Sequence, residues 1–209
     1  MWSDDCRRRI DELYAEILRT PFVRGLARGT LPPEVFRAYL HDDEIYLKHY
    51  SRIMRRIASR LERPEHARAF EDFAARGVDA EHELHRSFMA AGADDAAKAC
   101  PSPAFTRYMA LQTVAADAPA PLGAAVMLPC FTAYRYVGLD LAARTAPANP
   151  YQSWIDAYAG EEFGRDTARI IRICDELAAD TPQLRRAMTI AFIAAAQAEW
   201  FVWNSAYTL

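Results

Sequence analysis

Residues 36–61 decide the fold class, and they read FRAYLHDDEIYLKHYSRIMRRIASRL. Apolar side chains recur three or four residues apart, which places them in one stripe along a helix. Thr30-Leu-Pro-Pro-Glu precedes the stretch, and prolines are favoured in the first turn of a helix because the N–H groups there need no partner. The stretch therefore predicts a long amphipathic helix. Its apolar positions are Phe36, Tyr39, Leu40, Tyr46, Leu47, Tyr50, Ile53, Met54 and Ile57.

The rest of the chain repeats this pattern between proline and glycine breaks, and no window alternates for long with the period of a strand. We therefore predict an all-α fold, a single bundle-like domain over residues 1–209, with no repeat or linker. The expected helices cover 4–19, 22–28, 36–61, 64–91, from 104 to the break at 119–121, from that break to 144, 151–159, 163–179 and 183–207.

Composition narrows the class of protein. The 209 residues are 52% hydrophobic and 25% charged, which excludes a disordered chain. A net charge of −3 offers no basic surface for nucleic acid. Acids stand where a signal peptide would carry basic residues, and three prolines interrupt the uncharged stretch 118–134. Four widely spaced cysteines indicate free thiols. We expect a cytoplasmic protein.

Asp43 interrupts the apolar stripe of residues 36–61. It lies four residues after Tyr39 and three before Tyr46, in the centre of the stripe, whereas Asp42 and Glu44 are expected to point away. A carboxylate in this position is unfavourable unless it is hydrogen-bonded or faces a ligand. Taken alone, a structural role satisfied by tyrosine hydroxyls is an equal alternative.

Glu199 is the only charged residue between Ala187 and Leu209. It shares its helix face with Phe192 and Trp203, and no basic residue of the same segment can neutralise it. Desolvation should raise its pKa and make it a proton donor near neutral pH. As with Asp43, a purely structural role is the alternative.

Cys130 follows Pro129 inside the uncharged stretch 118–134. Pro129 either begins a helix or kinks one, and a helix beginning there would favour the thiolate through its N-terminal field. A buried cysteine alone is more often a small apolar side chain. Together with a protonated Glu199 and an orienting Asp43, however, it forms a sensible set for nucleophilic catalysis.

A metal site receives less support. Glu81 and His85 stand four residues apart, a spacing that suits metal ligation. Because His85 is the last histidine, the C-terminal half could add only carboxylates or thiols, and we expect no metal. The sequence also contains no Gly-rich phosphate loop and no G-x-S-x-G motif.

Five segments in register resemble the TenA, or thiaminase II, family. They are PFVRGLARGTLP (21–32), YLHDDEIYL (39–47), LPCF (128–131), YQSWIDAY (151–158) and EWFVWNSAY (199–207). The resemblance implies the haem-oxygenase-like fold without haem or another cofactor, commonly as a homotetramer. It also implies an activity in thiamine salvage: hydrolysis of 4-amino-5-aminomethyl-2-methylpyrimidine to the hydroxymethyl compound and ammonia, or cleavage of thiamine.

The resemblance also assigns roles to individual residues. It makes Cys130 the nucleophile and Glu199 the proton-transfer group, while Asp43 and Tyr46 hold the pyrimidine. Tyr134 and Tyr158 match further substrate-binding tyrosines.

Two positions depart from the family pattern. Phe105 stands where a tyrosine is usual, so one hydroxyl is missing unless Tyr108 supplies it, and Glu44 replaces an aromatic residue. Loss of a hydroxyl can change substrate preference sharply. Two other functions stay open: a non-catalytic ligand-binding or regulatory protein, and a di-metal oxidase on the same fold.

Overall fold

The computed structural model describes the backbone of residues 1–89 and 100–208, and the side chains of the same residues except 76–87 and 89. This described part contains ten α-helices and no strand, which confirms the all-α prediction. The helices are α1 (Trp2–Arg9), α2 (Asp11–Ile17), α3 (Pro21–Arg28), α4 (Pro33–Ala58), α5 (Pro64–Met89), α6 (Pro103–Asp117), α7 (Ala120–Arg144), α8 (Gln152–Ala159), α9 (Glu161–Leu177) and α10 (Pro182–Ser205).

Three helices begin at a hydroxyl residue followed by proline. The side chains of Thr20, Ser102 and Thr181 accept hydrogen bonds from backbone N–H groups three residues on, and the proline after each occupies the first helical position. The hydroxyl satisfies one of the donors left open at a helix start, and proline has no N–H to satisfy. These local signals explain why the sequence places the helix starts well.

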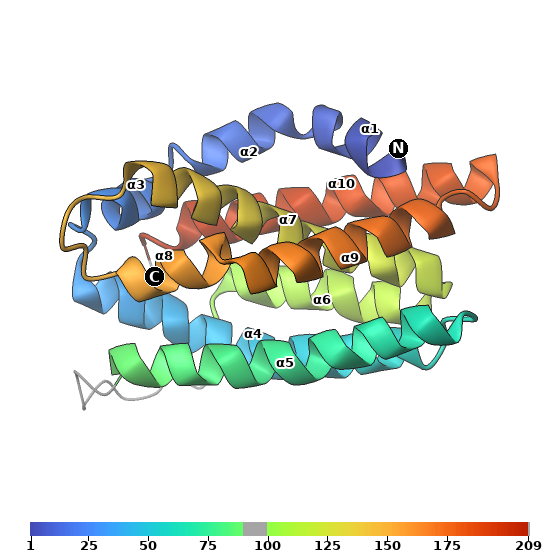
Figure 1. Cartoon of the computed structure of the whole chain (residues 1–209), viewed down its shortest axis with the longest axis horizontal. Coiled ribbons are helices and arrows are strands. Elements are labelled where there is room, and N and C mark those ends of the chain that lie inside the picture. Colours follow the sequence, from blue (N-terminus) through green and yellow to red (C-terminus); the bar gives the residue numbers. More distant parts are fainter. Residues whose placement is uncertain (90–99, 209) are drawn as a thin grey trace.

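Helix α7 lies in the middle of the bundle (Figure 1). It contacts α8, α9 and α10 as well as α6 and α4, and most of its residues are buried. The window of α7 that is apolar enough to cross a membrane is 67% buried inside the protein. A helix that is apolar on all sides is stable in water when other helices surround it. We therefore assign α7 as the core helix.

One expected helix differs from the structure, and one alternative that the sequence left open is decided by it. The expected helix over residues 4–19 is two helices, because the chain turns at Ile10, where φ is −119° and ψ is 11°. Pro129 lies inside α7, nine residues after its first residue, and no helix begins there. Of the two alternatives that the sequence left open, a helix beginning at Pro129 is excluded, so no N-terminal field acts on Cys130.

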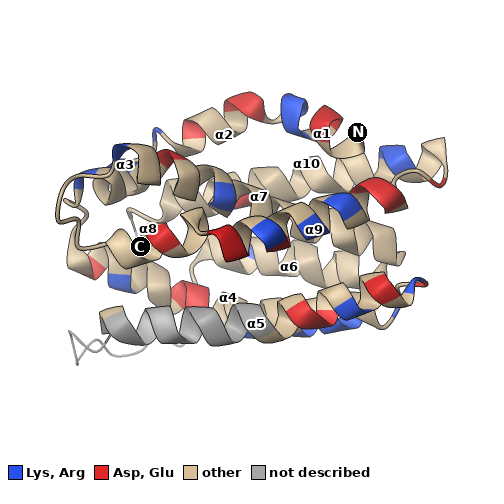
Figure 2. Ribbon diagram, viewed as in Figure 1, with Lys and Arg blue, Asp and Glu red and all other residues tan. Residues whose placement is uncertain are grey.

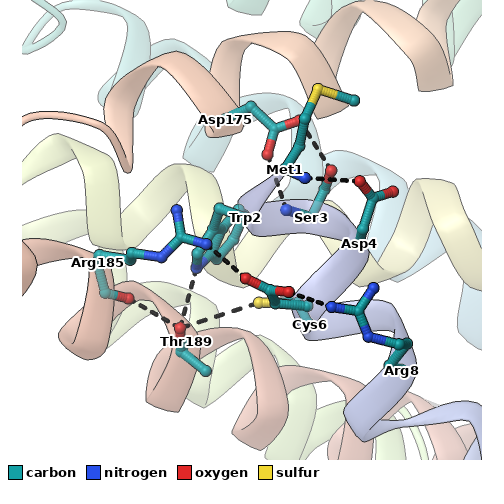
Figure 3. A network of polar contacts seen from close by, with 10 residues as sticks. Met1, Trp2, Ser3, Asp4, Cys6, Arg8, Asp175, Arg185 and Thr189 are labelled. Atoms are coloured by element: carbon teal, nitrogen blue, oxygen red, sulfur yellow. Dashed lines mark hydrogen bonds and ion pairs between the residues drawn. The ribbon is translucent and has the colours of Figure 1, made fainter.

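Polar contacts attach α1 to α9 and α10 (Figure 3). The Trp2 indole N–H donates to Thr189 Oγ1 at 2.9 Å, and the Ser3 backbone N–H and hydroxyl donate to the two Asp175 carboxylate oxygens at 2.7 and 2.8 Å. Trp2 itself is buried among apolar side chains. These contacts hold the first helix against the bundle.

Candidate active site

Three helices far apart in sequence bring the predicted catalytic residues together. Burial raises the pKa of Tyr46 on α4 well above its ordinary value, and the nearby Cys130 on α7 and Glu199 on α10 raise it further. Burial and the neighbours Asp43 and Glu199 act in the same way on the pKa of Tyr134. Electrostatic effects of this kind require proximity. The five residues therefore belong to one cluster.

Glu199 is buried, with 1% of its surface exposed. Burial raises the pKa of its carboxyl from 4.5 to about 8, and the charge of Asp43 adds to the rise, whereas the nearby Tyr108 hydroxyl and the Trp203 indole N–H oppose it. The Trp203 indole N–H donates to Glu199 Oε1 at 3.2 Å. The raised pKa agrees with the sequence prediction, and it keeps the carboxyl protonated at neutral pH.

Cys130 is partly buried, and it lies in α7 directly after Pro129. Proline has no N–H, so the α-helical hydrogen bond that residue 129 would donate is missing beside the cysteine. Thr132 stabilises this turn of α7, because its hydroxyl donates to the carbonyl oxygens of Leu128 and Pro129 at 3.3 and 3.4 Å. The Tyr14 hydroxyl is 2.7 Å from the same threonine oxygen. Thr132 and Tyr14 thus hold the turn of α7 that carries Cys130.

Asp43 is buried at 2% exposure, as predicted, but the expectation that Asp42 points away is wrong. Asp42 is also 2% exposed, and its carboxylate accepts a hydrogen bond of 3.0 Å from the backbone N–H of Ser102. Helix α4 contacts α5, α6 and α7, so the buried arc is wider than the apolar stripe alone indicates. Asp42 anchors the start of α6. Glu44 does point outward and pairs with Lys48 at 2.9 Å.

Aromatic rings surround the polar cluster. On α8, the Tyr158 ring lies 4.8 Å from that of Tyr134, which also lies 4.8 Å from Trp203. Helix α8 comes this close because α7 has Gly138 there, where a Cβ atom would lie 2.7 Å from the Tyr158 carbonyl carbon. The Tyr134 hydroxyl forms a 2.8 Å hydrogen bond with that of Tyr39. Flat rings of this kind suit a planar heterocycle.

Helix α6 contributes three side chains to the cluster. Phe105 is buried, with its ring 5.9 Å from that of Tyr46, and it brings no hydroxyl. One turn later, Tyr108 stacks on the same tyrosine at 5.7 Å and an interplanar angle of 13°. After a further turn, the Gln112 side-chain amide donates to the Tyr46 hydroxyl at 3.0 Å.

Sequence reasoning did not identify Gln112, Tyr39 or Trp203. Residues 105, 108 and 112 are spaced to share one helix face. The polar amide of Gln112 on this otherwise aromatic face was the signal in the sequence that could have identified it.

Among the described side chains, no group of three or more histidine, cysteine, aspartate or glutamate residues is placed to hold a metal ion. Glu81 and His85 lie outside the described side chains.

Comparisons with known proteins identify relatives of the whole chain. Residues 7–209 match the model of the TENA/THI-4/PQQC family. The chain is 30% identical to the aminopyrimidine aminohydrolase of Bacillus subtilis over 214 residues, covering 99% of this chain and 89% of that protein. It is 34% identical to the thiamine biosynthesis multifunctional protein ThiED of Corynebacterium efficiens, covering 88% of this chain but spanning only 25% of that protein's length.

A solved structure shows the same fold. The TenA homologue from P. horikoshii OT3 superposes with a TM-score of 0.87 at 26% identity, covering 100% of this chain and 99% of the other. The match therefore extends over all ten described helices and includes the cluster on α4, α6, α7, α8 and α10. Together, the family model and the relatives show that this chain belongs to the TENA/THI-4/PQQC family.

Proposed function

We propose that this protein is a cytoplasmic, cofactor-free aminopyrimidine aminohydrolase of thiamine salvage, which converts 4-amino-5-aminomethyl-2-methylpyrimidine to its hydroxymethyl counterpart. One observation carries the proposal: a buried glutamate with a pKa of about 8 lies in the same cluster as Cys130 and Asp43. Strongly perturbed carboxyl groups beside a nucleophile are typical of active sites. The relative from Bacillus subtilis, named an aminopyrimidine aminohydrolase, supports the assignment.

Substrate orientation falls to Asp43 and the aromatic rings. The carboxylate offers acceptors to the exocyclic 4-amino group and shares a proton with a ring nitrogen. Tyr46, Tyr134 and Tyr158 provide faces and edges against which the pyrimidine packs. Holding the ring in one orientation brings its reactive carbon to the Cys130 sulfur, which replaces a bimolecular encounter with a positioned one.

The reaction then needs one covalent intermediate. The Cys130 thiolate forms a C–S bond to an electron-poor ring carbon, and the displaced electron pair moves to a ring nitrogen, which takes up the proton that it shares with Asp43. Return of that pair breaks the C–N bond to the exocyclic methylene, and the nitrogen leaves as ammonia with the bond's electrons and a proton from Glu199. Water adds its oxygen to the methylene and returns a proton to Glu199. Cleavage of the C–S bond then restores the thiolate and the aromatic ring, and the ring nitrogen returns its proton to Asp43.

The direct test is ammonia release from the aminomethyl pyrimidine, with the hydroxymethyl product identified by mass spectrometry. We expect one ammonia for each product molecule. Because the acid form of Glu199 is the proton donor, kcat/KM should fall as the pH rises through about 8. Binding of the pyrimidine with no ammonia release at any pH would instead favour the non-catalytic, ligand-binding function.

We also propose that the protein is a homo-oligomer, a homotetramer as the resemblance implies, and that α6 and α10 form an interface. Val114 on α6 and Ile190 on α10 are 70% and 63% exposed. The two helices are antiparallel (Figure 1), and the Arg107 guanidinium lies 4.7 Å over the Phe201 ring between them. Val114 is two turns beyond Arg107, and Ile190 is three turns before Phe201, so all four share one face.

Helices α6 and α10 carry few charged residues (Figure 2). Helix α6 has only Arg107 and Asp117, and after Arg186 helix α10 has only the buried Glu199. Exposed apolar side chains with few charges around them are typical of interfaces between subunits.

We expect Ile190→Lys to reduce the oligomer to smaller species in light scattering coupled to size-exclusion chromatography. A lysine at this position would bring a charge into an apolar contact. The control is Leu139→Lys, which charges an exposed leucine on α7 and should leave the mass unchanged. A wild-type protein with the mass of one 23.6 kDa chain would refute the proposal.

A further inference from the structure

Two buried polar atoms of the candidate site lack a regular hydrogen bond within the described part of the chain: Tyr108 Oη and Glu199 Oε2. They belong to helices that pack against each other, α6 and α10. The Tyr108 hydroxyl lies beside the Glu199 carboxyl, close enough to oppose the rise of its pKa. Buried hydroxyl and carboxyl oxygens are nearly always hydrogen-bonded, because a buried oxygen without a partner destabilises the fold. A hydroxyl and a carboxyl oxygen that lie side by side without a regular hydrogen bond indicate a ligand group that forms hydrogen bonds with both.

The position of the Tyr108 hydroxyl is set by its ring and helix. The ring stacks on that of Tyr46, and the Gln112 amide one turn later holds the Tyr46 hydroxyl at 3.0 Å. At the start of the helix, the Asp42 carboxylate holds the Ser102 backbone N–H. Since both neighbouring turns are fixed, Tyr108 cannot easily turn away to satisfy its hydroxyl elsewhere. The packing of α6 therefore fixes the position of this hydroxyl.

A primary amine has the chemistry that this pair of atoms requires. Its N–H groups donate to Tyr108 Oη, and its nitrogen exchanges a proton with Glu199 Oε2. The aminomethyl group of the proposed substrate is such an amine. The thiazolium nitrogen of thiamine, the other substrate that the family resemblance implies, has no N–H and offers nothing to the hydroxyl.

We propose that Tyr108 and Glu199 together bind the amine leaving group, and that Tyr108 makes the site prefer an aminomethyl pyrimidine to thiamine. This inference rests on the proposed function. In the step concerned, the C–N bond breaks, its electrons stay on nitrogen, and the proton comes from Glu199. Tyr108 transfers no proton and only accepts the N–H hydrogen bond. It supplies, one turn along α6, the hydroxyl that Phe105 lacks.

The first test compares two substrates in Tyr108→Phe. For the aminomethyl pyrimidine, loss of a hydrogen bond to a charged or reacting group should lower kcat/KM about 10- to 100-fold. For thiamine, kcat/KM should change less than about twofold, because no hydrogen bond is lost. The matched control is Tyr151→Phe, which removes a buried hydroxyl that donates to the Leu31 carbonyl oxygen at 2.6 Å, outside the site. It should not change the ratio of the two substrates. An equal loss for both substrates, or none, would overturn the inference.

A second measurement needs no turnover. The carboxyl C=O stretch of Glu199, identified by its absence in Glu199→Gln, reports protonation in an infrared titration. The ionisable side chains near Glu199 are Asp43 and Tyr46 on α4, Tyr14 on α2, Tyr108 on α6, and Cys130 and Tyr134 on α7. Removing only the Tyr108 hydroxyl should raise the Glu199 pKa, because that hydroxyl stabilises the carboxylate.

The two measurements separate the two proposals. An unchanged Glu199 pKa in Tyr108→Phe would show that the pair does not interact and would overturn the inference. Wild-type protein that shows the pKa shift on mutation but releases no ammonia would refute the proposed function while the Tyr108–Glu199 contact stands.

Discussion

Replacing Cys130 with serine should abolish ammonia release while the pyrimidine still binds. Serine keeps the size of the side chain, but its hydroxyl is ionised far less readily than a thiol and is a much weaker nucleophile without a strong base. We expect turnover to fall by roughly three orders of magnitude or more. Affinity should stay within about threefold, because Asp43 and the aromatic rings, which hold the pyrimidine, are unchanged. Ammonia release and calorimetric binding of the substrate measure the two quantities.

The matched control is Cys100→Ser, which removes an exposed thiol just before α6. Its activity should equal that of the wild type. If Cys130→Ser turned over at a rate near that of the wild type, the nucleophile would be another group. If both the variant and the wild type bound the pyrimidine without reaction, the protein would be a binding protein.

Glu199→Gln should slow ammonia release by about 100- to 10,000-fold near neutral pH, the range typical of a lost general acid. Glutamine has nearly the same shape and can still accept the hydrogen bond of Trp203, but it has no proton to give to the leaving nitrogen. The decline of kcat/KM through pH 8, which reports this carboxyl in the wild type, should also disappear. A variant that kept the alkaline decline would place that titration on another residue.

The same substitution should stabilise the fold. In the unfolded chain the Glu199 pKa has its ordinary value of 4.5, and in the folded chain it is about 8. At pH 7 the unfolded state is therefore ionised and the folded state protonated, which favours unfolding by something on the order of 3 kcal/mol. This destabilisation is absent below about pH 4.5, grows as the pH rises to about 8 and is constant above. Glutamine cannot ionise, so the Tm at pH 7 should rise by several degrees.

The Tm of Glu199→Gln also tests whether its lower activity results from partial unfolding. A variant that is slower because it is partly unfolded would have a lower Tm, whereas a site residue removed from an intact fold gives low activity with a higher Tm. Glu161→Gln, on a side chain that is 96% exposed, is the control and should change neither quantity.

Sequence reasoning succeeded where the cause is local. The helix predicted from the prolines after Thr30 begins at Pro33, and the starts expected at 22, 104 and 183 lie one residue after those of α3, α6 and α10. Capping and a first-turn proline involve only neighbouring atoms, so the local sequence carries this signal. The burial of Asp43 and Glu199 also followed from their own helices, since each lies on an apolar stripe. The raised pKa of Glu199 is a direct consequence of that burial.

Errors arose where a second helix decides the outcome. Asp42 is buried because the start of α6 lies against α4 and presents a backbone N–H to it. The sequence also left open whether Pro129 begins a helix or lies inside one. It lies inside α7 because contacts with the surrounding helices, summed over the whole length of α7, outweigh one missing hydrogen bond. Neither effect can be seen in the pattern of a single segment.

The sequence by itself determined the all-α class, the helix starts at proline and the identity of the chemically unusual residues. Each of these depends on side chains within one or two helical turns of one another. Only the tertiary structure decided that Cys130, Glu199 and Asp43 share one cluster, and that Tyr108 lies beside Glu199. Those relations depend on how α4, α6, α7 and α10 are rotated and shifted against each other, and packing between helices sets these positions.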